Sequence, residues 1–337
     1  LDEMFASWPW QRINEMQEVG AVHLDTVRLQ PKHARPGDEM SCRVSVHDSW
    51  AGNLLPKAFF KANDQIYPAT VSDDGKSFAA NWVAGDENGS YPVSLLLEWA
   101  QYERIETVLL GSYIIDGTPP LLEVDLRGGK MYQDMQVFNR NVVVVTSMVV
   151  PKPLSRWRLS INYWLDVDDK QYIGEMKGKG NLPSSFVWEG HGYYGDGIYE
   201  FVVEAWDHAG NKGLASATAE YSKALPKVDL ALSKKQDQMI MDVQYASKVP
   251  LRYWRLEMWT NEGRLLTEAE GSELPVKVGF KPPEATDQEI TGFVFLQDAF
   301  GKQSRVKVEE LLPELKKKRQ QKEDEATGIS ENWVDEF

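Results

Sequence analysis

Acidic side chains are the residues in this sequence whose type and spacing come closest to a known chemistry. Asp166, Asp168 and Asp169 stand close together, and carboxylate oxygens are the hard ligands that Ca²⁺ prefers. The stretch departs from an EF-hand loop, because it has no glycine at the sixth position and no glutamate at the twelfth. The other interpretation is a polar hairpin turn without a metal, and we favour that turn.

Asp207 and Asn211 form a second possible cation site. With acidic residues of a neighbouring linker they would supply oxygen ligands, as happens between some tandem adhesion domains. The same two side chains can instead make hydrogen bonds within their own turn, which Asp and Asn often do. We favour the second interpretation, and we predict no metal and no cofactor.

Glu189, Asp196 and Glu200 lie near Trp188 in the sequence, and a pair of carboxylates is the catalytic arrangement of most glycosidases. Carboxylates in a turn next to a tryptophan are also common where no reaction takes place. The glycine-rich loop in this stretch matches neither phosphate-binding pattern and lacks a following helix. No HExxH, CxxC or GxSxG pattern is present, and the histidines lack metal-like spacing. We therefore predict that the protein is not an enzyme.

Aromatic residues offer a further possibility, because the chain has 12 Trp and 13 Tyr. Most of them are expected in the core, since sandwich cores need large side chains. Trp188, Tyr193 and Tyr194 are the candidates for an exposed aromatic surface that would stack on sugar rings.

These candidates are positioned by the stretch from Trp188 to Asn211, around which the chain is organised. The Gly-Asp-Gly sequence at 195–197 predicts a tight turn, because glycine takes positive φ at no steric cost. Residues 198–206 are rich in aromatic and β-branched side chains and predict a strand. Residues 207–212 predict a second turn.

The pattern G-D-G-x-Y-x-x-x-V-x-A-x-D-x-x-G-N at residues 195–211 resembles the last hairpin of bacterial immunoglobulin-like domains. That family includes modules of flagellar hook-cap proteins and tandem repeats on envelope proteins. The resemblance is clearest over residues 117–222 and implies a seven-stranded β-sandwich of about 100 residues. Such domains serve as spacers, docking surfaces or adhesion modules, so the fold does not specify one function.

Repetition of this unit predicts an all-β chain of three tandem Ig-like or fibronectin-III-like sandwiches. D-G-T-P-P at 116–120 resembles the junction between tandem domains, and its prolines favour a stiff linker. The turn at 298–302 repeats the turn at 207–211. We expect an N-terminal docking segment at 1–20, sandwiches at 21–116, 117–223 and 224–308, and a charged tail at 309–337.

Alternating apolar residues and turn signals predict the strands of the middle sandwich. We expect these strands near residues 121–126, 141–150, 156–165, 171–176, 197–206 and 214–221.

Both ends of the chain carry large apolar side chains that suit protein docking, because aromatic anchors supply binding energy. At the N-terminal end these side chains either pack on the first sandwich or dock another subunit. The C-terminal segment is either a solvated tail or a docking peptide. The candidate docking residues are Phe5, Trp8, Trp10, Trp333, Val334 and Phe337.

Composition limits the classes of partner and compartment. The net charge of −14 and pI of about 4.9 argue against nucleic acid and against an anionic membrane surface. The single cysteine, Cys42, excludes an intrachain disulfide and is expected to be buried. No apolar run is long enough for a membrane span. Because the chain starts at Leu1, we expect a processed or trimmed chain whose signal peptide or anchor is missing. The resemblance to envelope domains implies a location outside the cytoplasm of a bacterium.

The sequence therefore predicts a non-enzymatic scaffold or protein-docking subunit of a bacterial cell-envelope or surface assembly. Its expected partners are other protein subunits, held apart by a rod of roughly 100 Å. The alternative is a carbohydrate-binding, adhesion or enzyme-accessory module, for which a glycan would be the ligand.

Overall fold

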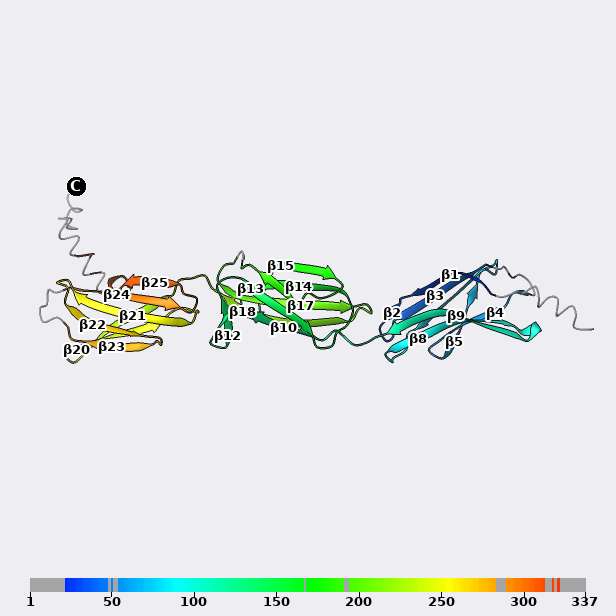
Figure 1. Cartoon of the computed structure of the whole chain (residues 1–337), viewed down its shortest axis with the longest axis horizontal. Coiled ribbons are helices and arrows are strands. Elements are labelled where there is room, and N and C mark those ends of the chain that lie inside the picture. Colours follow the sequence, from blue (N-terminus) through cyan, green and yellow to red (C-terminus); the bar gives the residue numbers. More distant parts are fainter. Residues whose placement is uncertain are drawn as a thin grey trace, which may run out of the picture.

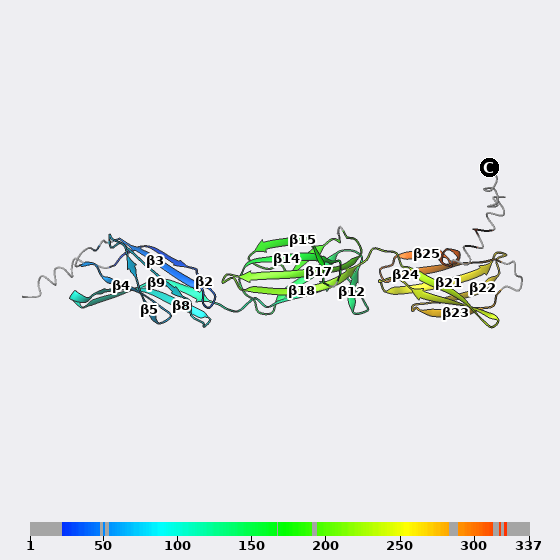
Figure 2. The ribbon, with the colours of Figure 1, turned by 180° about the vertical axis from the view of Figure 1, so that it is seen from behind.

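The computed structural model describes residues 22–47, 50, 54–166, 168–190, 194–282, 289–312, 317 and 320–321. The described residues form six β-sheets that enclose three separate clusters of buried side chains. The clusters follow one another along the chain, and the sheets around them lie end to end in an elongated arrangement (Figures 1 and 2). We call the sheets around each cluster the first, second and third sandwich.

The first sandwich consists of antiparallel strand pairs and one parallel pair. Its strands are β1 (Leu24–Gln30), β2 (His33–Ala34), β3 (Glu39–Val46), β4 (Lys57–Ala62), β5 (Gln65–Pro68), β6 (Thr70–Val71), β7 (Ser77–Val83), β8 (Gly89–Trp99) and β9 (Arg104–Ile115). The parallel pair is β2 with β9. A short 3-10 turn, η2 (Ala100–Tyr102), joins β8 to β9. The sheets have the strand orders β1-β3-β7-β6 and β2-β9-β8-β4-β5.

The second sandwich contains the sheet with the most strands among the described residues, which has six. Its strands are β10 (Leu122–Arg127), β11 (Lys130–Tyr132), β12 (Met135–Phe138), β13 (Val142–Met148), β14 (Leu154–Trp164), β15 (Lys170–Lys179), β16 (Ser185–Trp188), β17 (Gly197–Asp207) and β18 (Lys212–Tyr221). The sheets have the orders β10-β13-β16 and β11-β12-β18-β17-β14-β15.

The third sandwich is the smallest. Its strands are β19 (Val228–Lys235), β20 (Gln238–Tyr245), β21 (Leu251–Thr260), β22 (Leu265–Gly271), β23 (Val276–Phe280), β24 (Ile290–Asp298) and β25 (Gln303–Lys307), followed by the short helix α3 (Val308–Leu311). The sheets have the orders β19-β20-β23 and β22-β21-β24-β25.

The strand order in each sandwich is that of the immunoglobulin fold. In one sheet the first long strand pairs with the second, and the second pairs with a later strand. In the other sheet the third long strand pairs with the last strand but one, which pairs with the last. This division corresponds to the ABE and CFG sheets of immunoglobulin and fibronectin-III domains. The predicted fold class is therefore confirmed.

Two tyrosines support the same conclusion from side-chain geometry. The Tyr199 hydroxyl donates a hydrogen bond of 2.6 Å to the carbonyl of Gly195, at the start of β17. The Tyr91 hydroxyl donates one of 2.9 Å to the carbonyl of Glu87, at the start of β8. A tyrosine that bonds to the backbone a few residues upstream at this corner is a hallmark of immunoglobulin-like sandwiches.

Five of the six strands predicted for the second sandwich overlap long observed strands almost completely, and the sixth matches β10 to within a residue. β11, β12 and β16 were not predicted. Each of them has at most four residues, so the alternation of side chains is too short to give a signal. Cys42 is buried, as predicted.

Candidate functional site: two junctions at the ends of one strand

Strand β17 connects the two ends of the second sandwich. Its alternate residues Tyr199, Phe201, Val203 and Ala205 are all buried in the core. Eleven residues at about 3.4 Å each make a strand about 37 Å long. The turn before β17 contacts the linker to the third sandwich, and the turn after it contacts the linker from the first sandwich.

At the first junction a lysine joins the linker to the turn after β17. The Lys152 ammonium lies 2.7 Å from an oxygen of Asp116 in the linker and 2.7 Å from an oxygen of Asp207 in the turn. It also donates a hydrogen bond to the carbonyl of Thr118. The Asp207 side chain is only 2% exposed, so this ion pair is largely removed from water. A pair in that environment is screened far less than one on the surface.

Asn211 adds a second connection at the same place. Its side-chain amide donates a hydrogen bond of 2.7 Å to the carbonyl oxygen of Asp116 and one of 2.9 Å to the carboxylate of Asp207. Its backbone N–H donates 2.9 Å to the other oxygen of Asp207. The prediction that Asp207 and Asn211 bond within their own turn is therefore confirmed, and the same bonds position Asn211 to hold the linker.

The first sandwich holds the linker from its own side. The Asn88 side chain accepts a hydrogen bond of 2.8 Å from the Gly117 N–H and donates one of 3.0 Å to the Thr118 hydroxyl. Across the junction, the rings of His33 and His208 lie with centroids 5.3 Å apart. Both neighbouring sandwiches therefore contact the linker region directly.

The electrostatics of the first junction favour the charged forms. Burial alone would raise the pKa of Asp207, but hydrogen bonds from Lys152 and Asn211 outweigh it and hold that pKa below its ordinary value. Burial alone would lower the pKa of Lys152, but its bonds to Asp116 and Asp207 raise it. Carboxylate and ammonium therefore stabilise each other throughout the neutral range.

At the second junction a single carboxylate caps the outgoing chain. Asp196 lies in the turn before β17, and its oxygens accept hydrogen bonds from Lys223 N–H at 2.7 Å and Ala224 N–H at 2.9 Å. They also accept one of 2.8 Å from the Ser222 hydroxyl. Burial would raise the pKa of Asp196, yet these bonds lower it on balance. The carboxylate thereby fixes the backbone just before Pro226.

The third sandwich contacts this linker with a turn that matches the turn of the second. The Asp298 carboxylate accepts a hydrogen bond of 2.8 Å from the Lys302 N–H, just as the Asp207 carboxylate accepts one from the Asn211 N–H. The Lys302 ammonium donates 3.4 Å to the carbonyl of Ala224, and the Ser304 hydroxyl donates 2.6 Å to the carbonyl of Pro226. The turn whose repetition the sequence indicates thus meets the incoming linker at both junctions.

The structure gives a mixed result for the predicted aromatic surface. Trp188 is only 7% exposed, and its ring packs on Tyr199, Phe201 and Tyr221. It belongs to the core, because it faces inward from β16, and it does not contribute to an exposed aromatic surface. Tyr194 is 40% exposed and stacks on Tyr163 at a centroid distance of 4.7 Å.

The remaining candidates lie outside the described residues. They are Tyr193 and the predicted docking residues Phe5, Trp8, Trp10, Trp333, Val334 and Phe337. Their docking role therefore stays a prediction.

The candidate carboxylate sites have other partners. Asp166 and Asp169 exchange backbone hydrogen bonds in the hairpin turn between β14 and β15, as the turn interpretation predicts. Glu200 bonds to Lys170 at 2.9 Å and to Asn162 at 3.2 Å, while Asp196 binds the linker. Over the described part of the chain, no three His, Cys, Asp or Glu side chains are grouped so that they could hold a metal ion.

Sequence reasoning missed Lys152, which is the central residue of the first junction. The signal that points to it is its position between Pro151 and Pro153, because two prolines restrict the backbone around it. From this signal, Lys152 would be predicted to be a cation held at a fixed position, where it could pair with acidic turns.

Comparison with known proteins gives structural likeness only. No family model matches the sequence, and no curated protein matches it. A marsupial T cell receptor is 12% identical with a TM-score of 0.39, over 85% of this chain and 99% of that one. The FN1–FN3 domains of chicken CNTN1 are 9% identical with a TM-score of 0.27, over 86% of this chain and 99% of that one. A tetra-tandem repeat in the extending region of a large adhesion protein is 15% identical with a TM-score of 0.28, over 85% and 73%.

At these scores the likenesses add nothing to the fold assignment, which rests on strand order.

None of the helices in the described residues has the length and apolarity to cross a membrane.

Proposed function

We propose that the protein is a non-enzymatic structural subunit that works as a stiff spacer between other protein subunits. The observation that supports this proposal is that both linkers are hydrogen-bonded by the sandwiches on either side of them. Neighbouring domains in one chain usually move relative to each other unless their contact is extensive. In this protein, prolines within the linkers and hydrogen bonds from side chains of the neighbouring sandwiches restrict the motion of the linkers.

In this proposal each sandwich is a separate domain, with the boundaries 21–116, 117–223 and 224–308. The segments 1–20 and 309–337 bind the partners, with Phe5, Trp8, Trp10, Trp333, Val334 and Phe337 as anchors. The assembly belongs to a bacterial cell envelope or surface and lies outside the cytoplasm. This proposed location is based on the resemblance of residues 195–211 to tandem envelope domains.

Small-angle X-ray scattering tests the spacer role. We expect a scattering profile of the wild type that one extended conformation reproduces. In Lys152→Met the buried Asp207 loses its charged partner and keeps only the hydrogen bonds from Asn211, so we expect the linker to loosen and the profile to require an ensemble of bent conformations. Lys248→Met is the matched control, because it removes an ion pair between the exposed Lys248 ammonium and Glu220 at the second junction.

Circular dichroism must show that the sheets of each variant remain folded. A wild-type profile that itself requires many conformations would contradict the spacer role.

A pull-down from envelope extract tests the assembly role. The full chain should retain protein partners that a chain without residues 1–20, or without residues 326–337, loses. Identical partners for all three chains would show that the ends do not dock. A glycan-array signal without any protein partner would favour the carbohydrate-binding alternative.

A further inference from the structure

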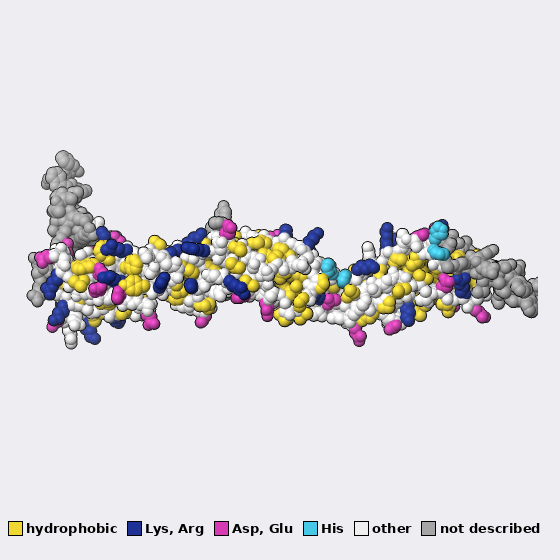
Figure 3. All heavy atoms as spheres, in the orientation of Figure 1, with side chains coloured by type: hydrophobic (Ala, Val, Ile, Leu, Met, Phe, Trp, Pro, Cys, Tyr) yellow, Lys and Arg dark blue, Asp and Glu magenta, His cyan; other side chains and the backbone are white. Residues whose placement is uncertain are grey.

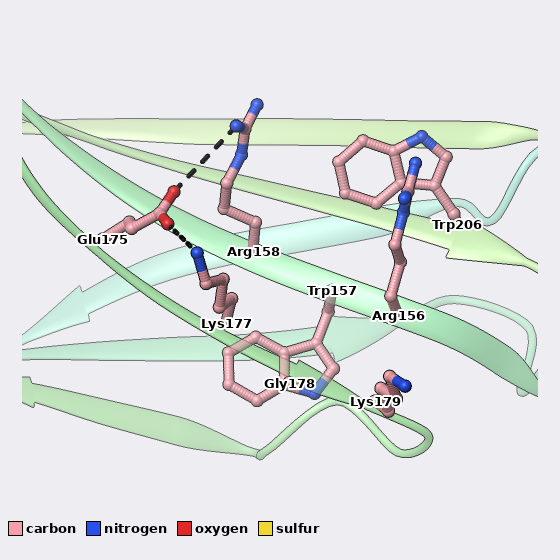
Figure 4. Close-up of a pocket in the computed structure, with 8 residues that line it drawn as sticks. All are labelled: Arg156, Trp157, Arg158, Glu175, Lys177, Gly178, Lys179 and Trp206. Atoms are coloured by element: carbon pink, nitrogen blue, oxygen red, sulfur yellow. Dashed lines mark hydrogen bonds and ion pairs between the residues drawn. The ribbon is translucent and has the colours of Figure 1, made fainter.

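A positively charged groove lies on the outer face of the second sandwich, next to the first junction, where Arg156 and Trp206 also line a hollow with Asp207 and His208. Its cavity of about 510 Å³ is lined by four cations and one carboxylate, together with two tryptophans and a glycine: Arg156, Arg158, Lys177, Lys179, Glu175, Trp157, Trp206 and Gly178. Figure 4 shows these side chains along strands β14, β15 and β17. The chain as a whole has a net charge of −14, so a concentration of cations stands out. Figure 3 shows that both acidic and basic side chains occur along one face of the molecule.

Only part of this positive charge is neutralised within the protein. Arg158 donates 2.6 Å to Glu204 and lies 4.0 Å from Glu175, which also binds Lys177 at 2.6 Å. In contrast, Arg156 and Lys179 have no carboxylate partner among the described residues. Both side chains are exposed. They are therefore free to pair with an anion that comes from outside.

The cations are spaced like the side chains of a strand. Arg156 pairs in register with Lys179, and Arg158 pairs with Lys177, so the four cations form two rows across β14 and β15. Residues two apart on one strand project to the same side about 6.8 Å from each other. An extended peptide with an acid at every second position has the same repeat of charge.

The backbone next to these cations is also open. β15 is the last strand of its six-stranded sheet, and its outer edge pairs with no described strand. Lysines on an edge strand disfavour pairing with another neutral or basic edge. The same lysines would favour an acidic strand, which can add to an open edge through main-chain hydrogen bonds.

We propose that the β15 edge and its groove bind an acidic polypeptide segment in extended conformation as an added strand. The surroundings of Trp206 favour a peptide over a sugar. Arg156 lies 4.5 Å from the centre of the Trp206 ring and Lys212 lies 5.6 Å from it. The cations thus occupy the space that a stacked sugar ring would need. This inference goes beyond the spacer function and does not depend on the stiffness of the junctions.

Fluorescence anisotropy with a labelled peptide tests the proposal. The probe is a peptide of about ten residues that alternates Glu and Thr, so that its acids share one side. Its control has the same composition with all the acids in one block. We expect the alternating peptide to bind more tightly, and its affinity to fall as salt is raised.

Variants locate the site. Replacing Arg156→Ser together with Lys179→Ser should weaken binding about tenfold, which corresponds to the loss of two charge pairs. The matched control is Arg127→Ser with Lys130→Ser, which removes the same charge from exposed positions elsewhere on the second sandwich. If both double variants weakened peptide binding equally, the proposed location of the binding site would be wrong. Binding of the block peptide as tightly as the alternating peptide would overturn the extended conformation.

Hydrogen exchange gives a second readout that does not depend on a variant. The alternating peptide should slow exchange of backbone amides in β15, because strand addition pairs them. Binding without any protection in β15, or binding of a sulfated oligosaccharide in place of the peptide, would contradict the proposal.

Discussion

At the scale of single residues, Lys152 has the position that a metal ion would have between two acidic side chains. Its ammonium lies 2.7 Å from both Asp116 and Asp207 and offsets one of their two negative charges from within the chain. Removing one partner of a buried ion pair leaves an unpaired charge and costs about 3 kcal/mol or more. The junction therefore depends on this one side chain more than on any surface ion pair.

The depressed pKa of Asp207 predicts how stability changes with pH. A carboxyl whose pKa is lower in the folded than in the unfolded state stabilises the fold above its unfolded pKa. That contribution is lost as the pH falls from about 4 through the lower folded pKa. Thermal unfolding followed across this range should show a steeper loss of stability for the wild type than for Asp207→Asn. Parallel curves for the two proteins would mean that Asp207 is not held in its charged form.

The corner tyrosine gives a second prediction at this scale. Tyr199→Phe removes the hydrogen bond to Gly195 but keeps the buried ring, so it should destabilise the second sandwich by about 1 kcal/mol. Chemical denaturation measures the difference. Tyr172→Phe is the control, because Tyr172 is 53% exposed, and it should leave stability unchanged. An unchanged Tyr199→Phe protein would show that the corner bond contributes nothing.

At the scale of elements, β17 joins both junctions through its two end turns, and β18 supports it. Gly213 at the start of β18 has no room for a side chain, because an added Cβ would lie 2.0 Å from the carbonyl oxygen of Pro120. The linker therefore packs directly on the backbone of β18. This contact couples the position of the linker to the sheet.

Gly213→Ala should force the linker away from β18 and destabilise the protein by about 1–3 kcal/mol. Ser216→Ala, at an exposed position of the same strand, is the control and should have little effect. Thermal unfolding of the two variants gives the comparison. Equal stability of Gly213→Ala and the wild type would contradict the close packing of linker and strand.

At the scale of the whole molecule, the sequence predicted the sandwiches better than it predicted what joins them. β17 begins at its predicted residue and ends one residue beyond the prediction, because this long strand lies between clear glycine and aspartate turns. Lys152 was missed because its partners, Asp116 and Asp207, are far from it in the sequence. Such contacts follow from the packed fold and leave no local pattern. The aromatic Trp188 was misplaced for the same reason, since only the fold shows which way β16 faces.

The burial of Cys42 allows spin labels to be attached only at cysteines that are introduced for the purpose. It raises the pKa of the Cys42 thiol to about 11, so this cysteine should stay unlabelled by a thiol reagent at neutral pH. Cysteines introduced at exposed Thr107, Ser216 and Gln244 would then carry spin labels, one in each sandwich.

Pulsed electron resonance distances between these labels test the stiff spacer most directly. The pairs 107–216 and 216–244 each span one junction, and a pair at 81 and 107 within the first sandwich gives the spread due to the labels alone. The spacer account predicts equally narrow distributions for all three pairs, with only the 107–216 distribution broadening in Lys152→Met. Broad distributions across the junctions of the wild-type protein would contradict it.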